Sequence, residues 1–239
     1  MSPLTIALPK GRPYAATVRF LREAGLAGPE LEPEEGRSLY VECPEQGTRF
    51  IIARDSDVPT YVEYGAADLG IVGKNVLMEA EPQVYELLDL GFSKCRFVLA
   101  APAGVDHRQL LSGRSTQRVA TKYPRMTEAY FNSRGLQVET IFLHGSIEVA
   151  PKVGLADLIV DIVETGRTLR ENNLVVVEEL WTSSMRLIAN RAAYRLQAER
   201  IAPIVRRLRE LVAQRDQAAR RESTAQREAA AGREPAANQ

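Results

Sequence analysis

A continuous apolar segment that ends in a small polar turn constrains the fold of this chain most. Residues 158–163 read LIVDIV, a nearly unbroken run of branched apolar side chains interrupted only by Asp161. Such a run is typical of a strand that is buried on both faces of a parallel sheet. The polar turn ETGRT follows at residues 164–168, where the strand would pass into a helix.

This turn has the residue types that suit a phosphate group. Gly166 lets the backbone bend sharply and approach a ligand closely, while Thr165 and Thr168 add hydroxyl groups. A helix that starts here presents unpaired N–H groups and the positive end of its dipole. A threonine-capped helix start that binds nothing is the alternative. The position favours a ligand, because open parallel sheets bind ligands at the carboxyl ends of their strands.

Two carboxylates flank the turn, and each has two interpretations. Asp161 is placed to accept hydrogen bonds from sugar hydroxyls, or else to bond nearby loop amides. Glu164 is placed to contact the same sugar, or else points at solvent.

Short apolar strands alternate with helical stretches along most of the chain. This pattern predicts an α/β fold with mainly parallel sheets. The alternation occurs twice, in the first hundred residues and again from about residue 118, and each half is too small for a large core. We therefore expect two α/β lobes that pack across a central cleft.

Composition excludes several classes of protein. The 239 residues carry a formal net charge of zero, so the overall field gives no reason to expect nucleic acid or an anionic membrane as a partner. Two cysteines, Cys43 and Cys95, are too few for a disulfide framework or a zinc site and fit a reducing cytoplasm. The N-terminus has no signal-sequence pattern, and no apolar run is long enough to cross a bilayer. A cytoplasmic protein is predicted.

The chain changes character beyond Arg191. Apolar residues there recur at helical spacing, which predicts a helix with one apolar face: Leu196, Ile201, Ile204, Val205, Leu208, Leu211 and Val212. This face either covers the protein's own first lobe or contacts a dimer mate or partner. Residues 214–239 are mostly Ala, Arg, Glu and Gln, so they bury too little surface to offset ordering, and a disordered tail is expected.

The turn at 164–168 resembles the phosphoribosyl-pyrophosphate loop of phosphoribosyltransferases. The larger group of those enzymes has two adjacent acids before the turn, whereas here Val160 replaces the first and Asp161 fits the second. This departure points to the ATP phosphoribosyltransferase family, the first enzyme of histidine biosynthesis. The resemblance spans residues 4–191. Five segments look like blocks of that family in its own order: ALPKGR at 7–12, RDSDVPTYVEYGAADLGIVGKNVL at 54–77, CRFVLA at 95–100, ATKYPRMTEAYF at 120–131 and GSIEVAPKVGLADLIVDIVETGRTLRENNL at 145–174, which includes the turn.

The resemblance implies a two-lobed fold like that of type II periplasmic binding proteins, in which the chain crosses between the lobes twice. We place the crossings near 91–94 and 182–184. Lobe I then comprises residues 1–92 and 184–213, and lobe II comprises residues 93–183 with the phosphoribosyl-pyrophosphate loop. The resemblance also implies the short form of the catalytic subunit, which dimerises within a hetero-oligomer containing a regulatory subunit that resembles histidyl-tRNA synthetase.

The implied reaction joins N1 of the adenine of ATP to C1 of the ribose of phosphoribosyl pyrophosphate, and pyrophosphate leaves. Such a site must hold the 5′-phosphate and the ribose hydroxyls and must surround the pyrophosphate with cations. The resemblance assigns the phosphate to residues 165–168, including the backbone of Arg167, and the ribose to Asp161, with Glu164 as a further contact. Mg²⁺ is implied as an ion carried by the substrate phosphates, with no dedicated protein site.

Cationic candidates for the phosphates of both substrates follow the first predicted strand. Lys10 and Arg12 flank Gly11 there, and Arg12 is assigned to pyrophosphate. Arg37 and Arg54 are further candidates because the family places arginines in these regions, although a surface arginine is by default a solvated side chain. Arg12, Arg37 and Asp161 are the predicted catalytic residues.

Three further residues are candidates for the ATP side of the cleft. Asp68 and Gly73 bracket a short predicted strand, and Asp68 either faces adenine or caps the start of that strand. Tyr123 either stacks on a base or packs in the protein core.

Two other functions fit parts of the sequence. A non-catalytic two-lobed binding module would explain the alternating strands, but it would not explain a phosphate turn combined with Lys10 and Arg12. A phosphoribosyltransferase for another base would have a similar loop.

Overall fold

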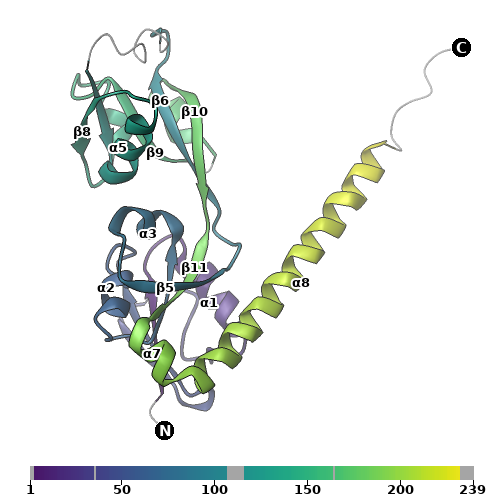
Figure 1. The fold of residues 1–239 in the computed structure, drawn as a ribbon. Helices are drawn as coiled ribbons and strands as arrows, with labels where there is room; N and C mark the ends of the chain where they lie inside the picture. The colour runs from purple at the N-terminus through teal and green to yellow at the C-terminus, as the bar shows by residue number, and fades with distance from the viewer. Residues whose placement is uncertain (1–2, 35, 107–115, 164, 232–239) are drawn as a thin grey trace, which may run out of the picture.

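The computed structural model describes residues 3–34, 36–106, 116–163 and 165–231. It has two α/β lobes, one above the other in Figure 1. Lobe I is built on a six-stranded sheet with the order β2-β3-β1-β4-β11-β5, and lobe II on a five-stranded sheet with the order β10-β6-β9-β7-β8. The predicted two-lobed α/β fold is confirmed.

The elements have the following bounds. The strands are β1 Leu4–Pro9, β2 Tyr40–Cys43, β3 Thr48–Ala53, β4 Leu69–Gly73, β5 Val84–Asp89, β6 Cys95–Pro102, β7 Gln117–Thr121, β8 Val138–Phe142, β9 Leu158–Val163, β10 Leu174–Ser183 and β11 Met185–Asn190. The helices are α1 Tyr14–Glu23, α2 Val58–Glu63, α3 Lys74–Ala80, α5 Pro124–Ser133, α6 Arg167–Glu171, α7 Arg191–Leu196 and α8 Ala198–Ala231, with short 3-10 turns at Pro44–Gln46 and Ile147–Val149.

Each sheet contains three neighbouring strands that are parallel. In lobe I these are β3, β1 and β4, and in lobe II they are β9, β7 and β8. The other pairs, β2 with β3, β11 with β4 and β5, and β6 with β9 and β10, are antiparallel, so the expectation of mainly parallel sheets was wrong for these pairs. Parallel neighbours need a long crossover connection, whereas β6, β10 and β11 carry the chain directly from one lobe to the other.

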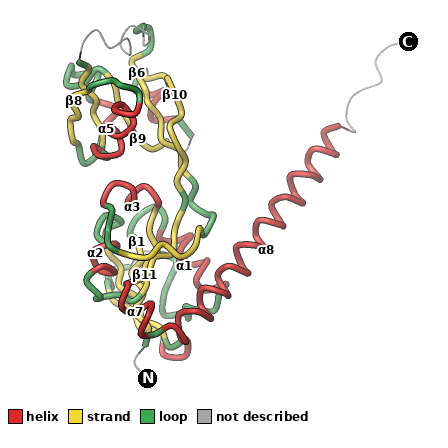
Figure 2. Tube along the Cα trace, in the orientation of Figure 1, coloured by secondary structure: helices red, strands yellow, loops and turns green. Residues whose placement is uncertain are grey.

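The chain passes between the lobes at residues 90–94 and at Ser184. Figure 2 shows β10 running down from lobe II and continuing as β11 in lobe I. The predicted boundaries at 92/93 and 183/184 fall in these two stretches, but the division into folding domains stays a prediction.

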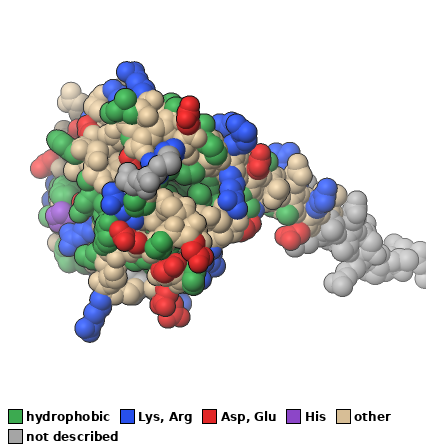
Figure 3. Space-filling model, turned by 90° about the horizontal axis from the view of Figure 1, so that it is seen from below, with side chains coloured by type: hydrophobic (Ala, Val, Ile, Leu, Met, Phe, Trp, Pro, Cys, Tyr) green, Lys and Arg blue, Asp and Glu red, His purple; other side chains and the backbone are tan. Residues whose placement is uncertain are grey.

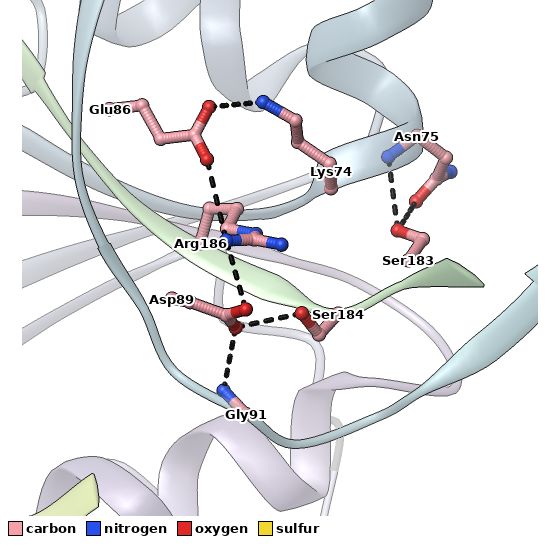
Figure 4. A network of polar contacts seen from close by, with 8 residues as sticks. All are labelled: Lys74, Asn75, Glu86, Asp89, Gly91, Ser183, Ser184 and Arg186. Carbon is pink, nitrogen blue, oxygen red and sulfur yellow. Dashed lines mark hydrogen bonds and ion pairs between the residues drawn. The ribbon is translucent and has the colours of Figure 1, made fainter. Parts of the chain in front are cut away.

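Polar contacts fix these two stretches to each other (Figure 4). The Asp89 carboxylate accepts hydrogen bonds from the Gly91 N–H at 2.9 Å and from the Ser184 hydroxyl at 2.7 Å. The Arg186 guanidinium lies 2.9 Å from Asp89 and 3.5 Å from Glu86. The two strands that cross between the lobes are therefore tied side by side.

Each lobe has its own buried aromatic and aliphatic core. Phe20, Phe50 and Leu8 are fully buried in lobe I, and Phe97 and Phe131 are almost fully buried in lobe II. Burial of such side chains supplies most of the free energy that holds each lobe together.

The apolar face of α8 covers lobe I. Ile201 and Leu208 are 0% exposed, and both belong to the core that contains Phe20. Farther along the helix, Arg215 forms an ion pair with Glu23 of α1 and stacks over the Phe20 ring at 4.9 Å. Of the two interpretations of this face, the structure therefore favours packing on the protein's own first lobe.

The expected disorder beyond residue 214 was wrong for the described part of the tail. Helix α8 continues to Ala231 and extends away from both lobes. Ala, Arg, Glu and Gln are strong helix formers, and the packed first half of α8 supplies the costly nucleus from which the helix propagates.

Charges of both signs are mixed over the surface that Figure 3 shows, where Lys and Arg side chains lie among Asp, Glu and apolar ones. This mixture agrees with the zero net charge of the chain. Among the described helices, none combines the length and the apolar character that crossing a membrane requires.

The packing of α8 predicts a stability difference between two adjacent positions. Leu208→Ala should lower the free energy of unfolding by about 2–5 kcal/mol, because it leaves a cavity in the lobe I core. Arg209→Ala, at an exposed neighbour, should change it by less than about 0.5 kcal/mol. Urea denaturation of both variants measures the difference, and equal effects would contradict the packing of α8 on lobe I.

Candidate active site

A cleft of about 820 Å³ lies between the lobes, where the parallel strands of both sheets end. Residues that follow the carboxyl ends of these strands supply most of its polar lining: Lys10 and Arg12 after β1, Asp55 after β3, Asn75 after β4, Lys122 and Tyr123 after β7, Glu148 after β8, and Thr165–Thr168 after β9. Asp161, near the end of β9, also lines the cleft.

The turn after β9 has the predicted tight geometry. Gly166 has a φ of 71°, a left-handed conformation that favours glycine, and α6 starts at the next residue. The Arg167 N–H donates to the Thr165 hydroxyl at 3.4 Å, and the Arg170 guanidinium donates to the Thr165 carbonyl at 3.3 Å. Thr165 and Thr168 both line the cleft. Glu164 lies outside the described residues.

Asp161 is a mostly buried carboxylate on β9 whose pKa is raised from 3.8 to about 6. Burial is the main cause, because removal from water disfavours the charged form. The Ile162 N–H donates to this carboxylate at 2.7 Å and lowers its pKa, and the Glu148 carboxylate raises it. Lys122 and Arg12 lower it further by their positive charge. Cations from both lobes therefore act on this one acid.

The loop after β1 brings two cations of lobe I to the cleft. Lys10 and Arg12 both line it, and the Lys10 N–H donates to the Ala53 carbonyl at 2.7 Å, which fixes the start of the loop against β3. Gly11 between them has a φ of 78° and does not line the cleft itself. Gly11 therefore allows the turn that places Lys10 and Arg12 at the cleft.

Asp68 does not belong to this cleft. It precedes the amino end of β4, where its carboxylate accepts hydrogen bonds from the Thr5 N–H at 2.8 Å and the Gln197 amide at 2.7 Å. The predicted contact with adenine was therefore wrong, and the alternative of a strand-start cap is correct. Gly73, at the other end of the same strand, does line the cleft.

Two arginines that were predicted to bind phosphate, Arg37 and Arg54, lie on the exposed surface. Arg37 is exposed before β2, and Arg54 is exposed directly after β3, where its carbonyl accepts from the Asp57 and Val58 N–H groups that open α2. Neither lines the cavity, so their roles in phosphate binding stay predictions.

Tyr123 lines the cleft but is only 5% exposed. Its ring packs edge-on against Phe97 at 4.8 Å, and its hydroxyl accepts a hydrogen bond from the Asn75 amide at 3.3 Å. Burial raises the pKa of the phenol well above its usual range. These contacts favour the packing interpretation over base stacking.

The cleft residues that were absent from the predicted site include Asp55, Asn75, Lys122 and Glu148. Three of them follow the end of a parallel strand by one or two residues, so a systematic reading of every strand end would have found them. Glu148 lies farther from β8, within the 3-10 turn Ile147–Val149, and its approach to Asp161 depends on tertiary packing.

Among known protein families, the model of ATP phosphoribosyltransferase (HisG) matches residues 54–210. The chain belongs to this family. An ATP phosphoribosyltransferase of Symbiobacterium thermophilum is 94% identical over 215 residues, which cover 90% of this chain and 97% of that protein. That size fits the short form of the family.

Solved structures support the same assignment. The ATP phosphoribosyl transferase (HisG:HisZ) complex from Thermotoga maritima has a TM-score of 0.73 and 35% identity, covering 88% of this chain and 99% of that one. The periplasmic aliphatic sulphonate binding protein SsuA from Escherichia coli has a TM-score of 0.56 at 14% identity, covering 91% and 76%, and shows the fold alone. The chain is thus a transferase of the first step of histidine biosynthesis, on a fold like that of periplasmic binding proteins.

The raised pKa of Asp161 predicts how stability depends on pH. A carboxyl group that holds its proton more tightly when folded costs stability above its folded pKa, here about 6, and the cost disappears as the pH falls toward about 4. Asp161→Asn should therefore raise the free energy of unfolding by about 1–3 kcal/mol at pH 8 and by much less near pH 4. Urea titrations across this range measure the effect, and a pH-independent difference would contradict it.

Proposed function

We propose that phosphoribosyl pyrophosphate binds in the cleft with its 5′-phosphate in the turn at residues 165–168 and its ribose hydroxyls on Asp161. The turn offers hydroxyl and backbone N–H donors at a strand end, and Asp161 lies on the strand that leads into it. The pyrophosphate group then faces Lys10 and Arg12 from lobe I, with Lys122 from lobe II as an additional cation. The meeting of the threonine turn, Asp161 and cations from both lobes in one cleft is the single observation that carries this proposal.

This arrangement suits a transfer that passes through an electron-poor ribose. As the C1–O bond to pyrophosphate breaks, positive charge develops on the ribose and negative charge on the leaving group. The Asp161 carboxylate would stabilise the first charge, and the cations of the cleft would stabilise the second. Positioning both substrates across the two lobes would supply the remaining acceleration, so no covalent nucleophile is needed. Adenine N1 is itself the nucleophile.

We place ATP beside lobe I, next to Gly73 and the loop after β1. These residues lie across the cleft from the turn that holds the phosphoribosyl group. The proposal keeps Lys10 for ATP phosphates and Arg12 for pyrophosphate. Arg37 and Arg54 remain candidates for further phosphate contacts at the surface.

Mg²⁺ fits this site as an ion that arrives with the substrates. The described acids that line the cleft, Asp55, Glu148 and Asp161, do not gather into a cluster of three ligands. Mg²⁺ binds readily through phosphate oxygens and water with few protein carboxylates, and it would neutralise charge on the leaving pyrophosphate.

We also propose a hetero-oligomer in the cytoplasm, made with a regulatory subunit that resembles histidyl-tRNA synthetase and containing a dimer of this chain. The support is the HisG:HisZ complex of Thermotoga maritima, whose structure matches 88% of this chain. The sequence has two cysteines, Cys43 and Cys95, and so small a number suits a reducing compartment. The mixed surface charge gives no support for nucleic acid or a membrane as a partner.

A single assay tests the activity. The protein is mixed with ATP, phosphoribosyl pyrophosphate and Mg²⁺, with and without the regulatory subunit, and the absorbance of phosphoribosyl-ATP is followed. Product in either condition is expected. Product formed only from another base would instead favour a different phosphoribosyltransferase.

Replacement of Asp161 should affect the chemical step. Asp161→Ala should lower turnover by at least about 100-fold, the scale expected when a contact made in the transition state is lost. Asp161→Asn keeps a hydrogen-bonding group without the charge and should fall between the alanine variant and the parent. Turnover equal to the parent in Asp161→Ala would rule out the ribose-binding role.

Replacement of Thr168 should affect binding of one substrate. Thr168→Val removes a hydroxyl that would donate to a charged phosphate, so the KM for phosphoribosyl pyrophosphate should rise about 10-fold or more while the KM for ATP changes little. Thr140→Val, on β8 where the hydroxyl contacts Glu128, is the matched control and should leave both KM values unchanged. A rise of both KM values in Thr168→Val would argue against a specific phosphate contact.

A further inference from the structure

Glu79 of α3 reaches from lobe I to the start of α5 in lobe II. Its two carboxylate oxygens accept hydrogen bonds from the backbone N–H groups of Arg125 at 3.0 Å and Met126 at 3.1 Å. Figure 1 shows α3 on the side of lobe I that faces lobe II. One side chain therefore spans the boundary between the lobes.

The first N–H groups of helix α5 have no capping side chain at the N-cap position of the helix. The N–H groups of the first turn of any helix have no partner within the helix, and the first residue of this one, Pro124, has no N–H. The residue at the N-cap position, Tyr123, makes no side-chain capping bond. Glu79 supplies both acceptors and places a negative charge at the positive end of the helix dipole.

Asn75, one helical turn before Glu79, makes a second contact with the same part of lobe II. Residues four apart on a helix share one face, so both side chains point toward lobe II. The Asn75 amide donates to the Tyr123 hydroxyl at 3.3 Å. The Ser183 hydroxyl, at the crossing between the lobes, donates to the Asn75 side chain at 2.9 Å and accepts from its N–H at 3.0 Å (Figure 4).

These contacts bear on the cleft because α5 starts directly after two of its lining residues. Lys122 and Tyr123 follow β7 and line the cavity. The Lys122 ammonium also lies 3.9 Å from the Asp55 carboxylate of lobe I. A fixed start of α5 therefore fixes the Lys122 cation relative to the lobe I side of the cleft.

We propose that Glu79 is a positioning residue that holds the two lobes at the separation the transfer reaction requires. It contacts no substrate and acts through the start of α5 on Lys122 and Tyr123. This inference rests on the proposed placement of phosphoribosyl pyrophosphate in the cleft. Because lobe separation affects substrate and transition state alike, its loss raises KM more than it lowers kcat.

The test compares Glu79→Ala with Glu81→Ala. Glu81 is the matched control because it belongs to the same boundary but pairs with the exposed Arg125 side chain, an ion pair of little energetic value. Hydrogen exchange of the Arg125 and Met126 amides is measured in the free protein, followed by KM and kcat for phosphoribosyl pyrophosphate. Glu79→Ala should speed exchange about 10-fold, as expected for a lost helix cap, and raise KM about 5- to 30-fold with kcat changed less than about 3-fold. Glu81→Ala should resemble the parent in both measurements.

Each other outcome overturns the proposal. Unchanged exchange in Glu79→Ala means that the contact across the lobes does not form in solution. Faster exchange with an unchanged KM means that the cap is structural only, and equal effects of both variants mean that Glu79 has no particular role. The exchange measurement requires no turnover, so it decides the contact even if the Asp161 variants refute the proposed ribose site.

Discussion

The direction of the six parallel strands decides where this protein can carry out chemistry. A parallel strand passes into its crossover at its carboxyl end, so polar turn residues gather along one edge of each sheet. The cleft lies between these edges of the two sheets, and it receives Lys10 and Arg12 from lobe I and Asp161 with its threonine turn from lobe II. The Asp161 carboxylate and the Lys10 and Arg12 side chains therefore come from different lobes.

The same arrangement carries an energetic cost. Asp161 is largely removed from water, and this burial raises its pKa more than the neighbouring cations lower it. A carboxylate in such a place is destabilising for the folded chain, and sites of this kind are where function and stability conflict. Contacts of Asp89 with Arg186 and Ser184 tie β5 to β11 where the chain crosses between the lobes.

Local sequence patterns predicted the parts of the site that depend on local structure. Gly166 and Gly11 adopt the left-handed conformations that their turns require, and Asp161 lies where its strand ends. Asp68 was misplaced because a five-residue apolar strand looks the same from either end, and only the sheet shows which end faces the cleft. Disorder was expected after residue 214 because that part of the chain can bury little surface by itself. It continues α8, whose packed first half supports the helix beyond residue 214.

The sequence by itself determined the order of strands and turns, the tight turn at Gly166 and membership of the family, because periodicity, glycine conformation and motif blocks are properties of neighbouring residues. Only the tertiary structure decided which strands pair antiparallel and that α8 covers its own lobe. It also decided that Glu79 caps a helix in the other lobe. These contacts join residues far apart in the chain, and their partners depend on how completed lobes pack, which no local pattern encodes.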